Sequence, residues 1–187
     1  KNLQVDNADI LKYNTDGLGE YKVVANLPYY ITSAVIRLFL ESYNKPEEIV
    51  ILIQREVAER ICAKPSRMSV LAVSVQFYGN PSIAEIVPRT AFFPAPKVDS
   101  AILKIRVYKK PLFDVDSRLF FRIVKAGFHE KRKQLINSLS GGLTLDRGVI
   151  EEMLSLANIK PQTRAEGLAM IDWYNLYNAY LEVHRAK

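Results

Sequence analysis

Asn26-Leu27-Pro28-Tyr29 is the stretch whose residue types and order suggest chemistry most directly. An exocyclic aromatic amine is a poor nucleophile, and two acceptors aimed at its N–H hydrogens favour a pyramidal nitrogen with a free lone pair. The Asn26 side-chain oxygen can be one acceptor, and the Leu27 carbonyl, held extended by the following proline, the other. Pro28 stiffens the turn, and a base can stack on Tyr29 for roughly 1–3 kcal/mol. The motif therefore predicts attack of an oriented amine on an electrophilic methyl group.

The same four residues also suit an ordinary strand-to-helix turn, because Asn and Pro are common turn residues. Their surroundings favour the catalytic interpretation. The motif follows a strand predicted over residues 21–25 and precedes a helix predicted over residues 31–42, which Thr32 or Ser33 can cap. An acidic residue, Asp9, lies at the end of an upstream strand.

Hydrophobic periodicity predicts the other elements that must position the motif. The apolar run 48–53 is typical of a central parallel strand, and residues 70–78 fit a helix or a strand equally well. Further strands are expected over residues 3–6, 83–87 and 101–107, and a short helix over residues 55–63.

Beyond a break in composition at Lys109-Lys110-Pro111, the pattern is helical only. One helix is expected over residues 118–139, another after Asp146 as its N-cap, and a third after Thr163-Arg164-Ala165-Glu166, which matches a capping box. The prediction is an α/β unit over residues 1–110 and a small all-α domain over residues 111–187. The α/β unit lacks a G-x-G-x-x-G turn, so we expect it to be the C-terminal portion of a doubly wound sheet.

The amino-acid composition limits the classes of function that the protein can have. The 187 residues are 49% hydrophobic and 25% charged, and their net charge of +6 is a mild bias toward polyanions, although a generically basic protein would show it too. No apolar run approaches the ~20 residues of a membrane span, and residues 1–6 lack the apolar segment of a signal peptide. The single Cys62 fits a reducing, cytoplasmic setting. One Cys and two His predict no zinc cluster, and the absence of G-x-S-x-G argues against an α/β hydrolase.

Seven segments span nearly the whole chain in one order: NADIL, VVANLPYYITS, ILIQREVAERI, RMSVLAVSVQFY, FFPAPKVDSAILKI, FHEKRKQLINSL and TRAEGL. In this order they resemble the ribosomal RNA adenine dimethyltransferases, which methylate two neighbouring adenosines near the 3′ end of small-subunit ribosomal RNA. NLPYYITS alone is shared with related adenine methyltransferases, including antibiotic-resistance enzymes that act on large-subunit RNA. FFPAPKVDSAILKI followed by FHEKRKQLINSL is much more specific to the dimethyltransferases.

The resemblance implies a Rossmann-like methyltransferase sheet, S-adenosyl-L-methionine (S-adenosylmethionine) as methyl donor, and no metal. By position, Asp9 resembles the acidic residue that holds the cofactor's adenine amino group, and Asn26 also belongs to the cofactor side of the site. Asn26 to Tyr29 resemble the catalytic motif, and Phe92 resembles the second aromatic residue flanking the target base. Phe93 can take that place instead. Plainer interpretations are a loop carboxylate for Asp9 and core packing for both phenylalanines.

A basic segment is the candidate RNA surface. Such charges usually form only a solvated helix face. They can also bind phosphates, which positions RNA without reading its sequence, while the target adenine must be flipped out of its stack to reach Asn26. The candidates are Lys131, Arg132 and Lys133, expected within a helix, with Arg122, Lys125 and His129 nearby in sequence, and Lys97 near the catalytic end.

Two features depart from the family pattern. The N-terminal strand with its Gly-rich loop, and the acidic residue of the next strand that binds the ribose, have no counterpart in these residues, and the family usually has several more residues around the KPSRMSV segment. We therefore expect the 187 residues to omit segments of a longer chain.

The leading hypothesis is S-adenosylmethionine-dependent N6-dimethylation of two adjacent adenosines near the 3′ end of small-subunit (16S) ribosomal RNA. The expected partner is the immature small ribosomal subunit, and the expected state a cytoplasmic monomer without membrane association. One alternative is a non-catalytic RNA-binding or ribosome-assembly factor. Another is an adenine methyltransferase acting on large-subunit ribosomal RNA or on DNA.

Overall fold

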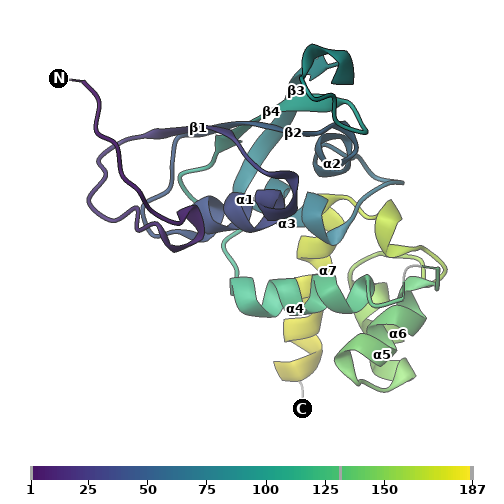
Figure 1. The fold of residues 1–187 in the computed structure, drawn as a ribbon. Helices are drawn as coiled ribbons and strands as arrows, with labels where there is room; N and C mark the ends of the chain where they lie inside the picture. Colours follow the sequence, from purple (N-terminus) through teal and green to yellow (C-terminus); the bar gives the residue numbers. More distant parts are fainter. Residues whose placement is uncertain (1, 131, 186–187) are drawn as a thin grey trace. The chain divides into compact units, whose positions relative to one another are not determined.

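The protein is represented by a computed structural model that describes residues 2–130 and 132–185. The chain divides into two compact units, one of Lys1–Ala58 with Gly79–Lys109 and the other of Glu59–Tyr78 with Lys110–Lys187 (Figure 1). Contacts therefore group residues 59–78 with the C-terminal residues. The assignment of separate functions to residues 1–110 and 111–187 stays a prediction.

The first unit is built on a four-stranded mixed sheet in the order β1-β2-β4-β3 (Figure 1). β1 and β2 are parallel and are joined through α1, whereas β4 runs antiparallel to both β2 and β3. The parallel pairing predicted for residues 48–53 thus holds on one side of β2 only. The element bounds are β1 (Lys22–Asn26), η2 (Tyr29–Ile31), α1 (Thr32–Glu41), β2 (Glu48–Gln54), α2 (Arg55–Ile61, which continues into the second unit), β3 (Gly79–Val87), η3 (Arg89–Ala91) and β4 (Ser100–Val107).

The core of this unit lies on one face of β2 and β4. The side chains of a strand alternate between two faces, and the buried side chains of β2 pair in register with those of β4. The register pairs Ile49 with Ile105, Ile51 with Leu103 and Ile53 with Ala101, and all six side chains are 0–1% exposed. Helix α1 buries Val35, Ile36, Phe39 and Leu40 on its apolar side.

Residues 3–6 do not form the predicted strand. Leu3 and Val5 are 81% and 82% exposed, and the next regular element is the short turn η1 (Ile10–Lys12). A strand needs a hydrogen-bonded neighbour, and among the described residues β2 is the strand paired with β1, so residues 3–6 have no partner. The alternation of apolar residues was therefore insufficient on its own to predict a strand over residues 3–6.

The predicted cap of the first helix is also wrong. The turn η2 runs directly into α1, so Ile31 takes the N-cap position and makes no side-chain cap. The backbone N–H groups of Ile31 and Thr32 donate to the carbonyls of Pro28 and Tyr29. Because the turn already satisfies these donors, the Thr32 hydroxyl is not used as a cap, and its Oγ1 is buried without a hydrogen-bond partner.

The second unit is helical and packs around aromatic side chains. Residues 70–78, open between helix and strand from sequence, form a helix whose Phe77 stacks on Phe120 with ring centroids 4.8 Å apart. Trp173 is fully buried and stacks on Phe128 at 5.4 Å. The element bounds are α3 (Val70–Tyr78), α4 (Ser117–Gly127), α5 (Leu135–Leu143), α6 (Arg147–Leu156), η4 (Ala165–Gly167) and α7 (Met170–Arg185).

The helix predicted over residues 118–139 is two helices separated by residues 128–134. Asp116 caps the first by accepting from the N–H groups of Arg118 and Leu119 at 2.8 and 3.2 Å. The second begins where the Leu135 N–H donates to the Thr163 carbonyl at 2.7 Å. This contact spans 28 residues of sequence, which is why periodicity within the segment did not reveal the break.

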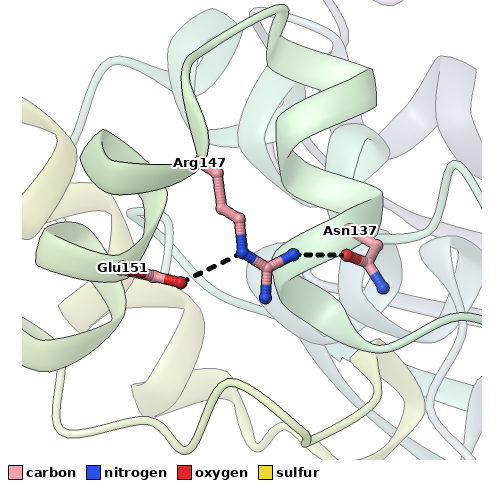
Figure 2. A network of polar contacts seen from close by, with 3 residues as sticks. All are labelled: Asn137, Arg147 and Glu151. Atoms are coloured by element: carbon pink, nitrogen blue, oxygen red, sulfur yellow. Dashed lines mark hydrogen bonds and ion pairs between the residues drawn. The ribbon is translucent and has the colours of Figure 1, made fainter.

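The other two predicted caps differ as well. Asp146 occupies the N-cap position of α6, but its side chain makes no cap hydrogen bond. The capping box at residues 163–166 is wrong because α7 begins later, at Met170, where Asp172 accepts from the Ala169 N–H at 2.8 Å. At the start of α6, the Arg147 side chain donates to Asn137 of α5 and to Glu151, each at 3.1 Å (Figure 2).

In the described ranges, no helix is both long and apolar enough to cross a bilayer.

Gly127 should tolerate no side chain. An added Cβ would lie 2.5 Å from Cη2 of Trp173, so we expect Gly127→Ala to lower the free energy of unfolding by about 1–3 kcal/mol. The measurement is urea denaturation followed by the fluorescence of Trp173, the only tryptophan in the sequence. The matched control is Gly148→Ala in α6, where nothing lies within 4 Å and the change should stabilise by up to about 1 kcal/mol. Equal stability of the two variants would contradict the prediction.

Candidate active site

The motif residues Asn26 and Leu27 lie at the carboxyl end of β1. The β1–β2 ladder ends at the pair Asn26–Leu52, so the Leu27 carbonyl lies one residue beyond the last paired position. Asn26 is exposed and shares a strand face with Val24, which is 81% exposed. The Asn26 side chain therefore lies outside the hydrophobic core, and the Leu27 carbonyl lies beyond the paired ladder.

Pro28 and the turn after it shape the motif. Pro28 has an extended backbone (φ −55°, ψ 132°), and its carbonyl accepts from the Ile31 N–H at 3.2 Å. This bond and the next, from Thr32 to the Tyr29 carbonyl, make the turn η2. The chain thus turns from strand to helix within a few residues, with the amide and carbonyl on the strand side and two tyrosines on the turn.

The two tyrosines of the turn differ. The Tyr29 hydroxyl lies 2.8 Å from the hydroxyl of Ser100, and its ring is half-buried. Tyr30 is 88% exposed. Ser100 is fully buried at the start of β4, paired with Gln54 of β2 on one side and Val87 of β3 on the other. Sequence reasoning missed Ser100; its position inside the FFPAPKVDS segment was the available signal.

Phe92 and Phe93 lie in the loop between β3 and β4. Asp99 closes this loop, because its Oδ1 accepts from the Arg89 N–H at 3.0 Å and its backbone carbonyl accepts from the Arg55 N–H at 3.0 Å. Phe93 is fully exposed and Phe92 is half-buried. The interpretation of Phe93 as a core residue is therefore wrong, and Phe92 is not part of the fully buried core either.

Asp9 and Lys97 are both exposed. Asp9 is the N-cap of η1, and its Oδ1 accepts from the Leu11 N–H at 3.0 Å. This explains why an acidic residue suits the position locally, while a role in holding a cofactor stays a prediction. Lys97 lies in the same loop as Phe92, two residues before Asp99.

Apart from Lys97, the predicted basic residues belong to the second unit. Arg132 and Lys133 are exposed in the turn between α4 and α5, so their placement in a helix is corrected, and Lys131 lies outside the described residues. The buried residues of α4 include Phe120, Ile123 and Val124, so its charged side chains face away from the core. Those residues are Arg118 and the predicted Arg122 and Lys125, followed by the exposed His129 just after the helix.

Metal binding and cysteine chemistry depend on His, Cys, Asp and Glu side chains. Within residues 2–130 and 132–185, no group of three or more His, Cys, Asp or Glu side chains is arranged to hold a metal ion. Cys62 is half-buried, and burial raises the pKa of its thiol. A thiolate is the reactive form of cysteine, so this residue is poorly suited to act as a nucleophile at neutral pH.

Comparison with known proteins gives consistent matches. Residues 1–182 match the profile of the family described as ribosomal RNA adenine dimethylase. A protein named ribosomal RNA small subunit methyltransferase A from Dehalococcoides mccartyi (strain CBDB1) is 47% identical over 184 residues, which cover 96% of this chain and 63% of the relative. One of the same name from Caldanaerobacter subterraneus subsp. tengcongensis is 44% identical over 180 residues, 95% of this chain and 66% of the relative. The chain thus spans just under two thirds of the length of these relatives.

Solved structures agree on the fold. The crystal structure of the 23S rRNA methyltransferase ErmE matches with a TM-score of 0.73 and 27% identity, over 94% of this chain and 71% of that one. A dimethyladenosine transferase from Plasmodium falciparum matches with a TM-score of 0.69 and 22% identity, over 88% and 68%. The predicted fold class, a Rossmann-like methyltransferase sheet accompanied by helices, is confirmed. From the profile match over nearly all its residues and the identity to these relatives, the chain belongs to the ribosomal RNA adenine dimethylase family.

Proposed function

We propose that the protein dimethylates, at N6, two adjacent adenosines near the 3′ end of small-subunit ribosomal RNA, with S-adenosylmethionine as the methyl donor. The observation that carries this proposal is the position of Asn26 and Leu27. Asn26 is an exposed residue at the last paired position of β1, and the Leu27 carbonyl lies one residue beyond it, in a chain of the adenine dimethylase family. The expected substrate is the immature small subunit, and the expected state a cytoplasmic monomer.

The residues of this chain act on the amine by hydrogen bonding. Asn26 Oδ1 and the Leu27 carbonyl accept from the two N–H hydrogens of a flipped adenine, which directs the nitrogen lone pair away from the ring plane. The exposed Asn26 side chain does not have to leave the core, and the Leu27 carbonyl lies beyond the paired part of the strand, so we expect both to be available to the amine. Tyr29 supplies a face for stacking the base, and the loop that carries Phe92 supplies the opposite side.

The residues present also fit the methyl donor in part. When bound, S-adenosylmethionine supplies the electrophilic methyl group. Asp9 is an exposed carboxylate whose Oδ1 accepts from the Leu11 N–H. Its other oxygen is the acceptor that we assign to the donor's adenine amino group, and Asn26 lies on the same side of the site in this assignment.

The relatives favour the small-subunit substrate. Proteins named small subunit methyltransferase A are 42–47% identical to this chain, whereas the 23S rRNA methyltransferase is 27% identical. The 23S enzyme's structural similarity nevertheless makes large-subunit RNA the second candidate substrate. Incubation of the full-length protein with tritiated S-adenosylmethionine and isolated small-subunit particles, large-subunit RNA or DNA distinguishes the substrates. If calorimetry detects no binding of S-adenosylmethionine, the protein is instead a non-catalytic assembly factor.

Asn26→Ala should abolish most methyl transfer without unfolding the protein. Loss of one preorganised group at the reacting amine is expected to lower kcat by about 100-fold or more. Because Asn26 is exposed, the free energy of unfolding should change by less than about 0.5 kcal/mol. The assay is tritium transfer to small-subunit particles, and Asn80→Ala, at an exposed position of β3, is the matched control. Full activity of Asn26→Ala would sink the catalytic assignment.

The double variant Arg132→Ala with Lys133→Ala should weaken RNA binding without changing the chemical step. Both side chains are exposed in the α4–α5 turn, and two lost phosphate contacts should flatten the dependence of log Kd on log salt concentration by about 1.4–1.8. The expected result is a higher KM for RNA at unchanged kcat, compared with Lys160→Ala, an exposed control in the same unit. An unchanged salt dependence would exclude this turn from the RNA surface.

A further inference from the structure

Ser100 is a buried polar residue that contacts the catalytic motif from inside the sheet. It is fully buried, and its hydroxyl lies 2.8 Å from that of Tyr29, 71 residues away in sequence. Its backbone is held between two neighbouring strands through the pairs with Gln54 and Val87. A buried hydroxyl without a partner is costly, so the contact with Tyr29 is the reason that a serine is tolerated here.

The hydroxyl contact fixes where the Tyr29 ring lies. The turn η2 positions the Tyr29 backbone, through the Ile31 bond to Pro28 and the Thr32 bond to Tyr29. The side chain can still rotate about two bonds. Anchoring the phenol oxygen to a residue fixed in the sheet removes the rotation about Cα–Cβ and so fixes the direction of the ring axis, whereas rotation about Cβ–Cγ leaves the oxygen in place. In the described part of the chain, the neighbouring Tyr30 forms no such hydrogen bond and is 88% exposed.

Stacking alone does not require the phenol oxygen, because phenylalanine presents an equivalent ring face. The oxygen of Tyr29 therefore has a separate use. The residue before Ser100, Asp99, closes the loop that carries Phe92 through its bond with the Arg89 N–H. Asp99, just before β4, and Ser100, its first residue, thus contact the loop of Phe92 and the ring of Tyr29, which are expected to flank the target base.

We propose that Ser100 is a positioning residue for methyl transfer. Its hydroxyl holds the Tyr29 ring at the position from which a stacked adenine presents its amine to Asn26 and to the Leu27 carbonyl. This inference rests on the proposed function, since it concerns the same adenine. Small errors in orientation are costly in transfer reactions, so the effect belongs in kcat rather than in substrate binding.

The test is a double-mutant cycle of Ser100→Ala and Tyr29→Phe in the full-length protein. Each single variant should lower kcat by about fivefold to tenfold, with the KM for RNA and for S-adenosylmethionine changed by less than about twofold. The double variant should be no slower than either single variant, because the two hydroxyls act only through each other. If the two losses multiply, or if kcat is unchanged in both singles, the proposal is overturned.

A matched control separates positioning from stability. Thr15 is 3% exposed in the same unit, and its Oγ1 donates to the Asn44 carbonyl at 3.0 Å. Thr15→Val removes a comparable buried hydroxyl bond away from the motif, so it should destabilise the fold while leaving kcat unchanged. If Ser100→Ala fails to fold, Tyr29→Phe decides, because it removes the same bond without altering the sheet interior. An unchanged kcat in Tyr29→Phe then overturns the proposal.

A second readout does not depend on activity. In protein labelled with ¹³C in its tyrosine rings, carbon relaxation should show the Tyr29 ring ordered in the wild type and mobile in Ser100→Ala. A ring equally ordered in both overturns the positioning role. If the wild type transfers no methyl group to any substrate, the proposed function fails, and the relaxation measurement still tests whether Ser100 holds the ring.

Discussion

Strand pairing between β1 and β2 stops at Asn26–Leu52, and the candidate site depends on that end point. A carbonyl inside a ladder is already used by the neighbouring strand, whereas one just beyond it can accept from a ligand. A one-residue shift in register would turn Asn26 toward the other face of the sheet. The buried register of β2 against β4, with isoleucines opposite Ala101, Leu103 and Ile105, fixes the two faces of β2, and the pairs from Lys22–Glu48 to Asn26–Leu52 align β1 with it.

β4 connects the sheet to the candidate catalytic motif through its first residue. It lies between β2 and β3, antiparallel to both, so its first residue is held from two sides. That residue, Ser100, contacts Tyr29, and the preceding Asp99 closes the loop of Phe92 and Phe93. An interior strand is the most rigid place from which to hold side chains of a turn and a loop, since those segments have few restraints of their own.

The helical unit depends on close contacts between its helices. Its helices approach closely where small residues permit it: an added Cβ on Gly127 would meet Trp173, and one on Gly142 would meet Ala126, each at 2.5 Å. The turn between α4 and α5 belongs to the same unit. The turn leaves Arg132 and Lys133 exposed rather than on a packed helix face. A basic turn on a rigid support suits contact with phosphates, which do not require a shaped pocket.

Sequence alone determined the features that depend on neighbouring residues. The mixed α/β class, strands β1 to β4, the turn at Asn26–Tyr29 and the helical C-terminal part all follow from periodicity and from turn chemistry within a few residues. Seven sequence segments in one order identified the family, which periodicity cannot do. Tertiary structure decided what depends on distant partners. Residues 3–6 are not a strand because no described strand pairs with them. The helix predicted over residues 118–139 is two helices, and the second begins where the Leu135 N–H donates to the Thr163 carbonyl. Ser100 remained unrecognised because its partner is 71 residues away. Hydrogen-bond satisfaction and burial are properties of the folded chain, so no local pattern could show that this serine and Tyr29 need each other.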